Sequence, residues 1–369
     1  MMRGGRLAAS SRLRVLQFVP RLRALGWHVD THALHDDDYI RNRYAGRWMP
    51  IARSLPLRYL DRLRVVLEAG DYDLLWIGSE ALPWLPAWCE KALFKIVGKP
   101  VVIDFDDAVW VRYRECGIAP LRWALGRKVA RLMAASDAVV AGSPEIAGYA
   151  RESGARRVVA IPTVVDTRRY SAGARDPGGE PVVCWIGTPS TAQMLDVAAQ
   201  GFTEAAKKRR FRLRSIGARA PDWSGVATET LPWSEETEAR DVGAATVGIM
   251  PLWDGPFQRG KCGCKLIQYM AAGLPVIASP VGVNRTIVRD GWNGYLAGTS
   301  AEWESALLRI LDDPDRAREM GRHGRALVER EYSLDSAAPQ LSALIEEVFR
   351  GHPTRADGSS GACAPSAGF

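Results

Sequence analysis

Strand and helix patterns alternate along nearly the whole chain of 369 residues. Two short runs, VVIDF within 100–105 and AVVAG at 138–142, are apolar over successive residues. Such runs are typical of parallel strands that are covered on both faces. Because segments of helical length separate them, the pattern predicts an α/β protein built on parallel sheets.

The alternating series is interrupted once. Residues 171–181 (SAGARDPGGEP) are rich in Gly, Pro and small side chains, which indicates a linker between two domains. We therefore expect an N-terminal domain at 1–170 and a second α/β domain at 182–335. A closing helix is expected at 336–351, and the Gly/Ser/Ala-rich tail at 352–369 is predicted to be disordered.

The amino terminus does not fit this plan. A doubly wound domain places its earliest strand at the centre of the sheet. Here the first clear element is a helix at 10–25, followed by a strand at 27–34, and 1–9 holds few strand-forming residues. We therefore predict that the central first strand is missing. Either the start of the chain is misassigned or truncated, or the first domain is poorly stable.

The composition narrows the class of protein. The sequence has no run of about 18 apolar residues, so no membrane span is predicted. The first residues lack the apolar core of a secretory signal. The six cysteines show no framework spacing, which favours reduced thiols and a cytoplasmic location. The pair Cys262 and Cys264 has no second cluster to complete a zinc site, so no metal is predicted.

The net charge of +7 comes from 49 basic and 42 acidic residues. Aromatic residues are not interleaved with the basic ones, so nucleic-acid binding is not predicted. The positive net charge is compatible with weak attraction to anionic lipid, and peripheral contact with the inner face of the plasma membrane is therefore an open alternative. Trp84 and Trp88 fit the core face of a helix, with an interfacial role as the alternative.

Ligands of open parallel sheets bind beyond the carboxyl ends of the strands, and two such domains imply a cleft between them. The predicted strand at 182–187 ends in Gly187, and hydroxyl residues then open a helix: Thr188, Ser190 and Thr191. Free N–H groups and hydroxyls at a helix start bind anions. The same residues also fit an ordinary helix cap.

A second cluster lies at Gly260, Lys261, Gly263 and Lys265. The two lysines are four residues apart and so share a helix face. They lie at the helix N-terminus, where the dipole disfavours cations unless an anion is bound. The glycines let a phosphate approach the backbone closely. This cluster predicts a phosphate-binding site.

A third cluster, Asp104, Asp106 and Asp107, follows a strand of the first domain. Burial and mutual repulsion should shift the pKa values of crowded carboxyl groups, as at catalytic sites. A structural role, in which Asp106 or Asp107 caps the next helix, is predicted equally well by the sequence. No G-x-G-x-x-G follows a strand and no P-loop motif is present, which argues against a dinucleotide oxidoreductase and a P-loop kinase.

The stretch GKCGCKLIQYMAAGLPVIASPVGVNRTIVRDGWNGYLA closely resembles the donor-binding region of group 1, or family 4, glycosyltransferases. IPTVVD at 161–166 with Tyr170, and the C-terminal GRHGRALVEREYSL, are similar to further segments of that family. The resemblance runs from about Arg6 to Arg350 and is most specific in the second domain. In the first domain it is carried by layout and by DFDDA.

The resemblance implies a GT-B fold, with two Rossmann-like domains facing a central cleft. It implies a bacterial hexosyltransferase that retains configuration, needs no metal or other cofactor, and takes its sugar from a nucleotide-diphosphate sugar. The acceptor is expected among cell-surface glycans, lipids or small molecules. The resemblance implies that the donor is bound by the first two clusters and Gln268. The implied catalytic residues are Asp104, Asp106 and Lys265. The implied acceptor-side residues are Ser10, Ser11 and Arg12.

The sequence departs from the family in the donor site and in the first domain. The family's Glu-x7-Glu pair aligns with Gly260 and Gln268, so both carboxylates are absent. Its Arg/Lys pair is replaced by TPST at 188–191, for which Lys261 and Lys265 are expected to compensate. Its first-domain catalytic His has no match. These losses keep a catalytically weak, sugar-nucleotide-binding GT-B protein as the alternative, while a GT-B epimerase is disfavoured because no suitable acid/base set is present.

Overall fold

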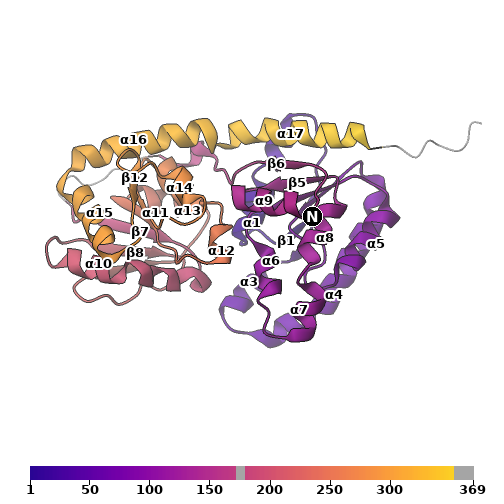
Figure 1. The fold of residues 1–369 in the computed structure, drawn as a ribbon, viewed down its shortest axis with the longest axis horizontal. Helices are drawn as coiled ribbons and strands as arrows, with labels where there is room; N and C mark the ends of the chain where they lie inside the picture. Colours follow the sequence, from indigo (N-terminus) through magenta and orange to yellow (C-terminus); the bar gives the residue numbers. More distant parts are fainter. Residues whose placement is uncertain (172–178, 353–369) are drawn as a thin grey trace, which may run out of the picture.

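The computed structural model describes residues 1–171 and 179–352, which form two α/β bodies side by side (Figure 1). Every strand pair within the described sheets is parallel, which confirms the predicted α/β class. Most of the predicted linker and all of the predicted tail except His352 lie outside the described residues. Among the described helices, none is both long and apolar enough to span a bilayer.

The first body holds a four-stranded sheet of order β3-β4-β5-β6 and a two-stranded pair β1-β2. Its strands are β1 Met2–Gly4, β2 Ala33–His35, β3 Leu75–Gly78, β4 Val101–Phe105, β5 Ala138–Ala141 and β6 Val158–Ala160. The second body holds a six-stranded sheet of order β12-β11-β10-β7-β8-β9. Its strands are β7 Val182–Ile186, β8 Arg212–Ile216, β9 Ala227–Leu231, β10 Val247–Met250, β11 Val276–Ala278 and β12 Gly294–Leu296.

Helices connect and cover these strands. In the first body they are α1 Ala9–Ser11, α2 Val19–Ala24, α3 Asp37–Tyr44, α4 Trp48–Leu67, α5 Ala87–Val97, α6 Val109–Arg114, α7 Ala119–Leu125, α8 Lys128–Ala135 and α9 Pro144–Glu152. From the second body onward they are α10 Asp196–Ala206, α11 Glu238–Gly243, α12 Pro256–Arg259, α13 Cys264–Ala271, α14 Asn284–Ile287, α15 Ser300–Asp312, α16 Pro314–Glu331 and α17 Leu334–Gly351.

Three predicted elements of the first body differ from the observed ones. The predicted helix at 10–25 is divided into α1, a π-helical turn at Arg12–Leu16 and α2. The predicted strand at 27–34 forms only as β2. The apolar pattern of residues 121–135 also predicts a single helix, which the structure divides into α7 and α8 around Gly126. In each case apolar periodicity found the segment but did not show where the backbone turns within it.

The prediction of a missing first strand was wrong. Residues Met2–Gly4 form β1, which pairs in parallel with β2. On its other side the Gly78 N–H donates to the Met1 carbonyl (2.8 Å), and the Met1 amino group donates to the Trp76 carbonyl (2.5 Å). Burial of that amino group lowers its pKa to about 5. Three residues are enough to fill this place because backbone bonds, rather than an apolar side-chain pattern, hold them there.

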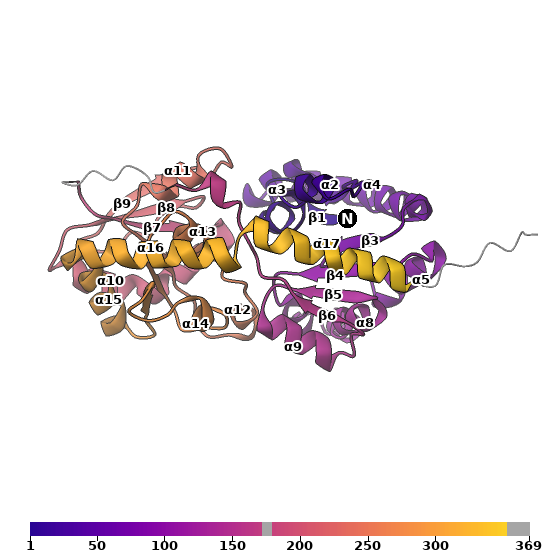
Figure 2. The same cartoon turned by 90° about the horizontal axis from the view of Figure 1, so that it is seen from above.

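The last helix ties the two bodies together. α16 runs along the second body, and α17 continues across the first (Figures 1 and 2). One face of α17 is buried in a cluster that includes apolar side chains of β4, β5 and α2. Its buried members are Leu334, Ala337, Ala338, Leu341, Leu344, Ile345 and Val348. The carboxyl end of the chain therefore completes the core of the amino-terminal body.

We predict that Leu341→Ala lowers the free energy of unfolding by about 2–5 kcal/mol, because Leu341 is 1% exposed and its truncation leaves a cavity under α17. Chemical denaturation followed by tryptophan fluorescence measures this change. Gln340→Ala is the matched control on the exposed face of the same helix, and it should shift stability by less than about 0.5 kcal/mol. Equal effects from both variants would contradict the packing role of α17.

Candidate functional site

The loop before α13 lies against the carboxyl end of β4 in the other body. The Cys262 thiol donates to the Asp106 carbonyl at 2.8 Å, and Lys261 Nζ lies 3.4 Å from Asp107 Oδ1. A Cβ at Gly260 would fall 2.5 Å from the Cβ of Ala108. Glycine is therefore required at 260, because its bare backbone is what lets the two bodies touch here. The second and third predicted clusters thus face each other across the interface.

The start of α13 gathers the predicted phosphate ligands. Gly263 caps the helix with φ +69°, and an added Cβ would meet Ile287 at 2.3 Å. Lys265 Nζ lies 5.6 Å from the centroid of the Trp185 ring. Burial first, and then repulsion from Lys261, lower the pKa of Lys265 to about 8. A bound anion would offset both effects.

The turn after β7 reaches the same place. A small cavity is lined by Trp185, Thr191, Met194, Met250, Pro251, Leu252, Lys261 and Lys265. The structure thus brings Thr191 of the first cluster to Lys261 and Lys265 of the second. Gly187 lies at the end of β7 with its N–H bonded to the Ile216 carbonyl (2.9 Å). Their binding of a donor stays a prediction.

The hydroxyl groups after Gly187 already have partners in their own turn. The Thr188 N–H donates to Thr191 Oγ1 at 3.1 Å, and the Thr191 hydroxyl donates to the Thr188 carbonyl at 3.0 Å. Ser190 Oγ lies 2.9 Å from Thr188 Oγ1 and is exposed. This geometry therefore also agrees with the alternative, in which these residues form an ordinary helix cap. Of the three hydroxyls, that of Ser190 is the most accessible to a ligand.

The three aspartates of the first body have different surroundings. Asp104 is 3% exposed and accepts from Arg14 Nε at 2.8 Å, while burial raises its pKa to about 6. Asp106 is partly exposed beside Ser10, and burial and Asp107 raise its pKa. Asp104 is thus enclosed with an arginine, whereas Asp106 and Asp107 lie at the interface. Of the three, only Asp106 and Asp107 are partly exposed to solvent.

The predicted acceptor-side residues are also separated. Ser11 is buried, and its hydroxyl donates to the Gly4 carbonyl at 2.6 Å. Ser10 is exposed near Asp106, and Arg12 is buried with its guanidinium 4.1 Å above the centroid of the Trp233 ring. Ser11 therefore stabilises the backbone after β1, and Arg12 contacts the second body.

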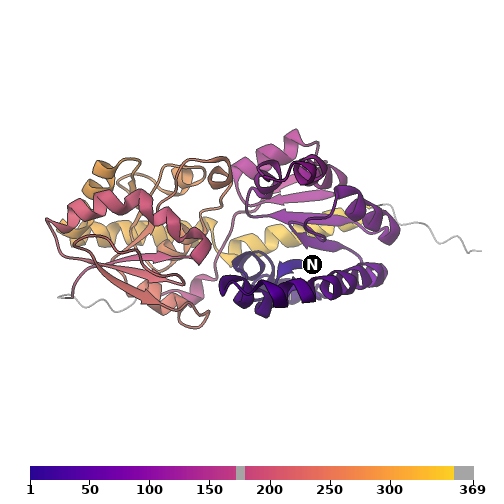
Figure 3. The ribbon, with the colours of Figure 1, turned by 90° about the horizontal axis from the view of Figure 1, so that it is seen from below.

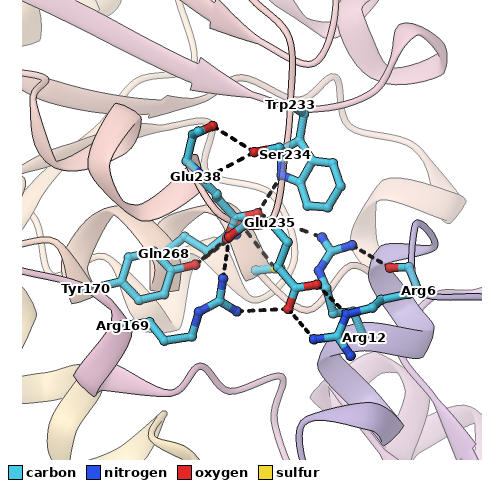
Figure 4. Close-up of polar contacts among 11 residues, drawn as sticks. Arg6, Arg12, Arg169, Tyr170, Trp233, Ser234, Glu235, Glu238 and Gln268 are labelled. Carbon is cyan, nitrogen blue, oxygen red and sulfur yellow. Dashed lines mark hydrogen bonds and ion pairs between the residues drawn. The ribbon is translucent and has the colours of Figure 1, made fainter.

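A carboxylate that the sequence analysis missed lies beside Gln268. Glu238, 3% exposed at the start of α11, accepts from the Tyr170 hydroxyl (2.5 Å), Trp233 Nε1 (2.6 Å) and Gln268 Nε2 (2.8 Å) (Figure 4). Arg12 Nη2 lies 3.8 Å from Glu238 Oε2, the oxygen that accepts from Trp233. Burial and the Glu238 charge raise the pKa of Tyr170. No spacing in the sequence links 238 to 268, so only the fold could reveal this contact.

A second glutamate of the same loop joins the two bodies. Arg6 makes a two-pronged contact with the carboxylate of Glu235, at 2.7 and 2.9 Å (Figure 4). Arg169 Nη2 donates to the Glu235 carbonyl at 2.6 Å. Glu235 lies in the turn just before α11 and Glu238 is the first residue of that helix, and they contact Arg6 and Arg12, which both follow β1. The sequence offered no signal for these pairs either.

Comparison with known proteins assigns the fold and both bodies to one family. Residues 180–313 match the family model described as "Glycosyl transferases group 1", and residues 13–169 match the model described as "Glycosyltransferase Family 4". The chain belongs to the group 1, family 4 glycosyltransferases, which confirms the resemblance seen in the sequence. The match to residues 13–169 ends just before the predicted linker, and the match to residues 180–313 begins at the linker's last two residues.

Related proteins of known name carry sugar-transferring activities. The chain is 26% identical over 279 residues to the D-inositol 3-phosphate glycosyltransferase of Nocardia farcinica, covering 67% of this chain and 60% of that protein. It is 25% identical over 372 residues to the phosphatidyl-myo-inositol mannosyltransferase of Mycobacterium leprae, covering 90% and 92%. The chain thus spans less than two thirds of the first of these relatives.

Solved structures share the fold. Sucrose-phosphate synthase from Thermosynechococcus elongatus superposes with a TM-score of 0.68 at 18% identity, covering 94% of this chain and 96% of that one. Anabaena HepE in complex with UDP and glucose superposes with a TM-score of 0.67 at 13% identity, covering 94% and 99%. At these identities the likeness shows the GT-B fold alone, and it confirms the predicted fold class.

We predict that Glu238→Ala lowers the free energy of unfolding by about 3 kcal/mol, because it removes the acceptor of several buried donors and the counter-charge of Arg12. Thermal and urea unfolding measure this change. Glu236→Ala, two residues away and exposed, is the control and should be near neutral. If the two variants were equally stable, the Glu238 contacts would not hold the bodies together.

Proposed function

We propose that this chain transfers a hexose from a nucleotide-diphosphate sugar to an acceptor, with retention of configuration and without a divalent metal. The observation that carries the proposal is the pair of lysines at the start of α13, with the Gly187–Thr191 turn across a small cavity. Lysine side chains and the free N–H groups of a helix start are suited to a diphosphate. Membership of the glycosyltransferase family supports this use of the site.

The donor diphosphate is proposed to lie between Lys261, Lys265 and the exposed hydroxyl of Ser190. The negative charge that develops on a departing diphosphate is stabilised by fixed positive groups that need no reorganisation. Lys265, with its pKa lowered to about 8, is still mostly protonated at neutral pH, and a neighbouring anion would raise that pKa again. Because HepE is described in complex with UDP and with UDP-glucose, UDP-sugars are the first donors to test.

The acceptor is proposed to enter on the first-body side of the interface, near Ser10, Asp106 and Asp107. Asp106, with a raised pKa, is the better candidate than Asp104 for holding or exchanging a proton with the acceptor hydroxyl, because Asp104 is enclosed with Arg14. Two relatives are named for inositol-bearing acceptors. Inositol phosphates and inositol lipids therefore lead the acceptor panel.

The loss of the family's two glutamates has a local explanation that favours an active enzyme. Gly260 is required by the contact with Ala108, and a carboxylate at 268 would lie against Glu238. Glu238 therefore supplies a negative group next to Gln268 from another helix. The second candidate function, binding of a sugar nucleotide without turnover, is tested by incubating the chain with radiolabelled UDP-glucose and the acceptor panel and by measuring release of UDP.

We predict that Lys265→Ala weakens UDP binding by about 1.5–3 kcal/mol, as for a lost charged hydrogen bond. Isothermal titration calorimetry measures the affinity, with Lys207→Ala, an exposed lysine after α10, as the matched control. UDP prefers the ammonium form of Lys265, so the affinity should be full below the pKa and fall as the pH rises above about 8.

Lys265→Arg tests the sign of that pH dependence. A guanidinium stays charged throughout this range, so the affinity of the variant should lose its fall above pH 8. An unchanged pH profile in Lys265→Arg, or unchanged affinity in Lys265→Ala, would remove Lys265 from the diphosphate site.

We predict that turnover does not require a divalent cation, because Lys261 and Lys265 supply the positive charge that a metal provides elsewhere. Transferase activity should be the same in EDTA and in magnesium or manganese. Loss of activity in EDTA that either ion restores would count decisively against the metal-independent mechanism.

A further inference from the structure

A small group of charged side chains crosses the interface between the two bodies beside α12. Figure 3 shows the orange segment around α12 on the side of the second body that faces the first. Asp107 of the first body has a cation near each of its oxygens. Its Oδ1 lies 3.4 Å from Lys261 Nζ of the second body, and its Oδ2 lies 4.0 Å from Arg112 Nη2 of the first. The carboxylate is therefore shared between the two bodies.

An aromatic ring of α12 contacts both of these cations. The centroid of the Phe257 ring lies 4.9 Å from Lys261 Nζ and 5.0 Å from Arg112 Cζ. The ring face attracts a cation through its electrons, so Phe257 stabilises the position of both groups. The backbone of Lys261 is fixed as well, because its N–H donates to the Gln258 carbonyl at 3.2 Å. Lys261 is thus held where it meets Asp107.

The two lysines of the proposed diphosphate site differ in their partners. Both line the same small cavity. Within residues 1–171 and 179–352, Lys265 forms no ion pair and has its Nζ over the Trp185 ring, whereas Lys261 is paired with Asp107. An anion that enters the cavity therefore meets one lysine without a carboxylate partner and one that already has such a partner. Full use of both lysines requires that the anion take Lys261 from Asp107.

The geometry of the pair allows such an exchange. The distance of 3.4 Å is longer than that of a typical charged hydrogen bond, which is about 2.7–2.9 Å. The side chains of Lys261 and Asp107 are 17% and 26% exposed, so neither charge is sealed inside the protein. A diphosphate carries more negative charge than one carboxylate and offers more acceptor oxygens. It is therefore the stronger partner for an ammonium group, and Asp107 keeps Arg112 beside it after the exchange.

We propose that Asp107 competes with the donor diphosphate for Lys261, which makes this residue of the first body a part of the donor site in the second. The inference rests on the proposed function, because it needs the diphosphate to bind at Lys261 and Lys265. Without a donor, the Asp107 carboxylate occupies Lys261. Binding of the donor exchanges this ion pair between the bodies for a contact with the ligand, so the pair opposes donor binding by the free energy of its own interaction.

Isothermal titration calorimetry of the full chain with UDP tests the competition. Asp107→Asn keeps the shape of the side chain and removes its charge, so it should raise UDP affinity by about threefold or more. A purely structural role of Asp107 predicts no such gain. Glu152→Gln is the matched control, because it removes one negative charge from the exposed end of α9 in the same body. This control should leave the affinity within about 1.5-fold of wild type.

A double-mutant cycle shows whether Asp107 acts through Lys261. In a Lys261→Ala background the competition is absent, so Asp107→Asn should then change UDP affinity by less than about 1.5-fold. Thermal shifts with millimolar UDP extend the measurement to weakly binding variants. Asp107→Ala provides the same comparison if Asp107→Asn does not fold.

Two outcomes would overturn the competition while leaving the donor site in place. One is an affinity that Asp107→Asn leaves unchanged or lowers. The other is an equal gain in the Lys261→Ala background, which would show that the carboxylate repels the diphosphate directly. A wild-type chain that does not bind UDP would instead contradict the proposed donor site, and this inference with it.

Discussion

The close approach of residues 260–262 to residues 106–108 is the contact on which the candidate site depends. It requires a glycine at 260, because a Cβ would overlap Ala108, and it is held by the Cys262 thiol on the Asp106 carbonyl and by Lys261 near Asp107. Residues 106–108 follow the carboxyl end of β4, and residues 260–262 lie in the connection after β10, just past α12. The contact therefore sets the ligand-binding edges of the two sheets against each other. Lys261 of one body and Asp106 and Asp107 of the other thereby lie at the same interface.

The same contact explains why the acidic groups of the site are arranged differently from the family pattern. Glycine at 260 excludes the first family glutamate by lack of space. Gln268 donates its amide to Glu238, and a second carboxylate there would place two like charges at about 3 Å in a buried site, which is strongly unfavourable. Glu238 is in turn balanced by Arg12 from the other body. Glu238 thus lies next to Gln268 on another helix and pairs with an arginine across the interface.

The two bodies are also tied by other contacts. Arg6 and Arg169 bind Glu235, and the buried face of α17 fills the core of the first body after the chain has left the second. Because α17 follows the second body in the chain and packs in the core of the first, unfolding of the first body would expose the apolar face of α17. The stability of the site is therefore a property of the whole chain.

The sequence by itself determined the class of fold, the donor-side motif and most strands, because buried parallel strands and a helix start with two lysines leave strong local patterns. It did not reveal β1, whose three residues are held by backbone bonds to β2 and β3 and carry almost no apolar signal. Nor could it separate Asp104 from Asp106, since the difference is an arginine 90 residues away in the chain that encloses only the first. Tertiary structure alone brought Glu238 to Gln268 and Arg12, because contacts between residues far apart in sequence depend on how the two bodies pack.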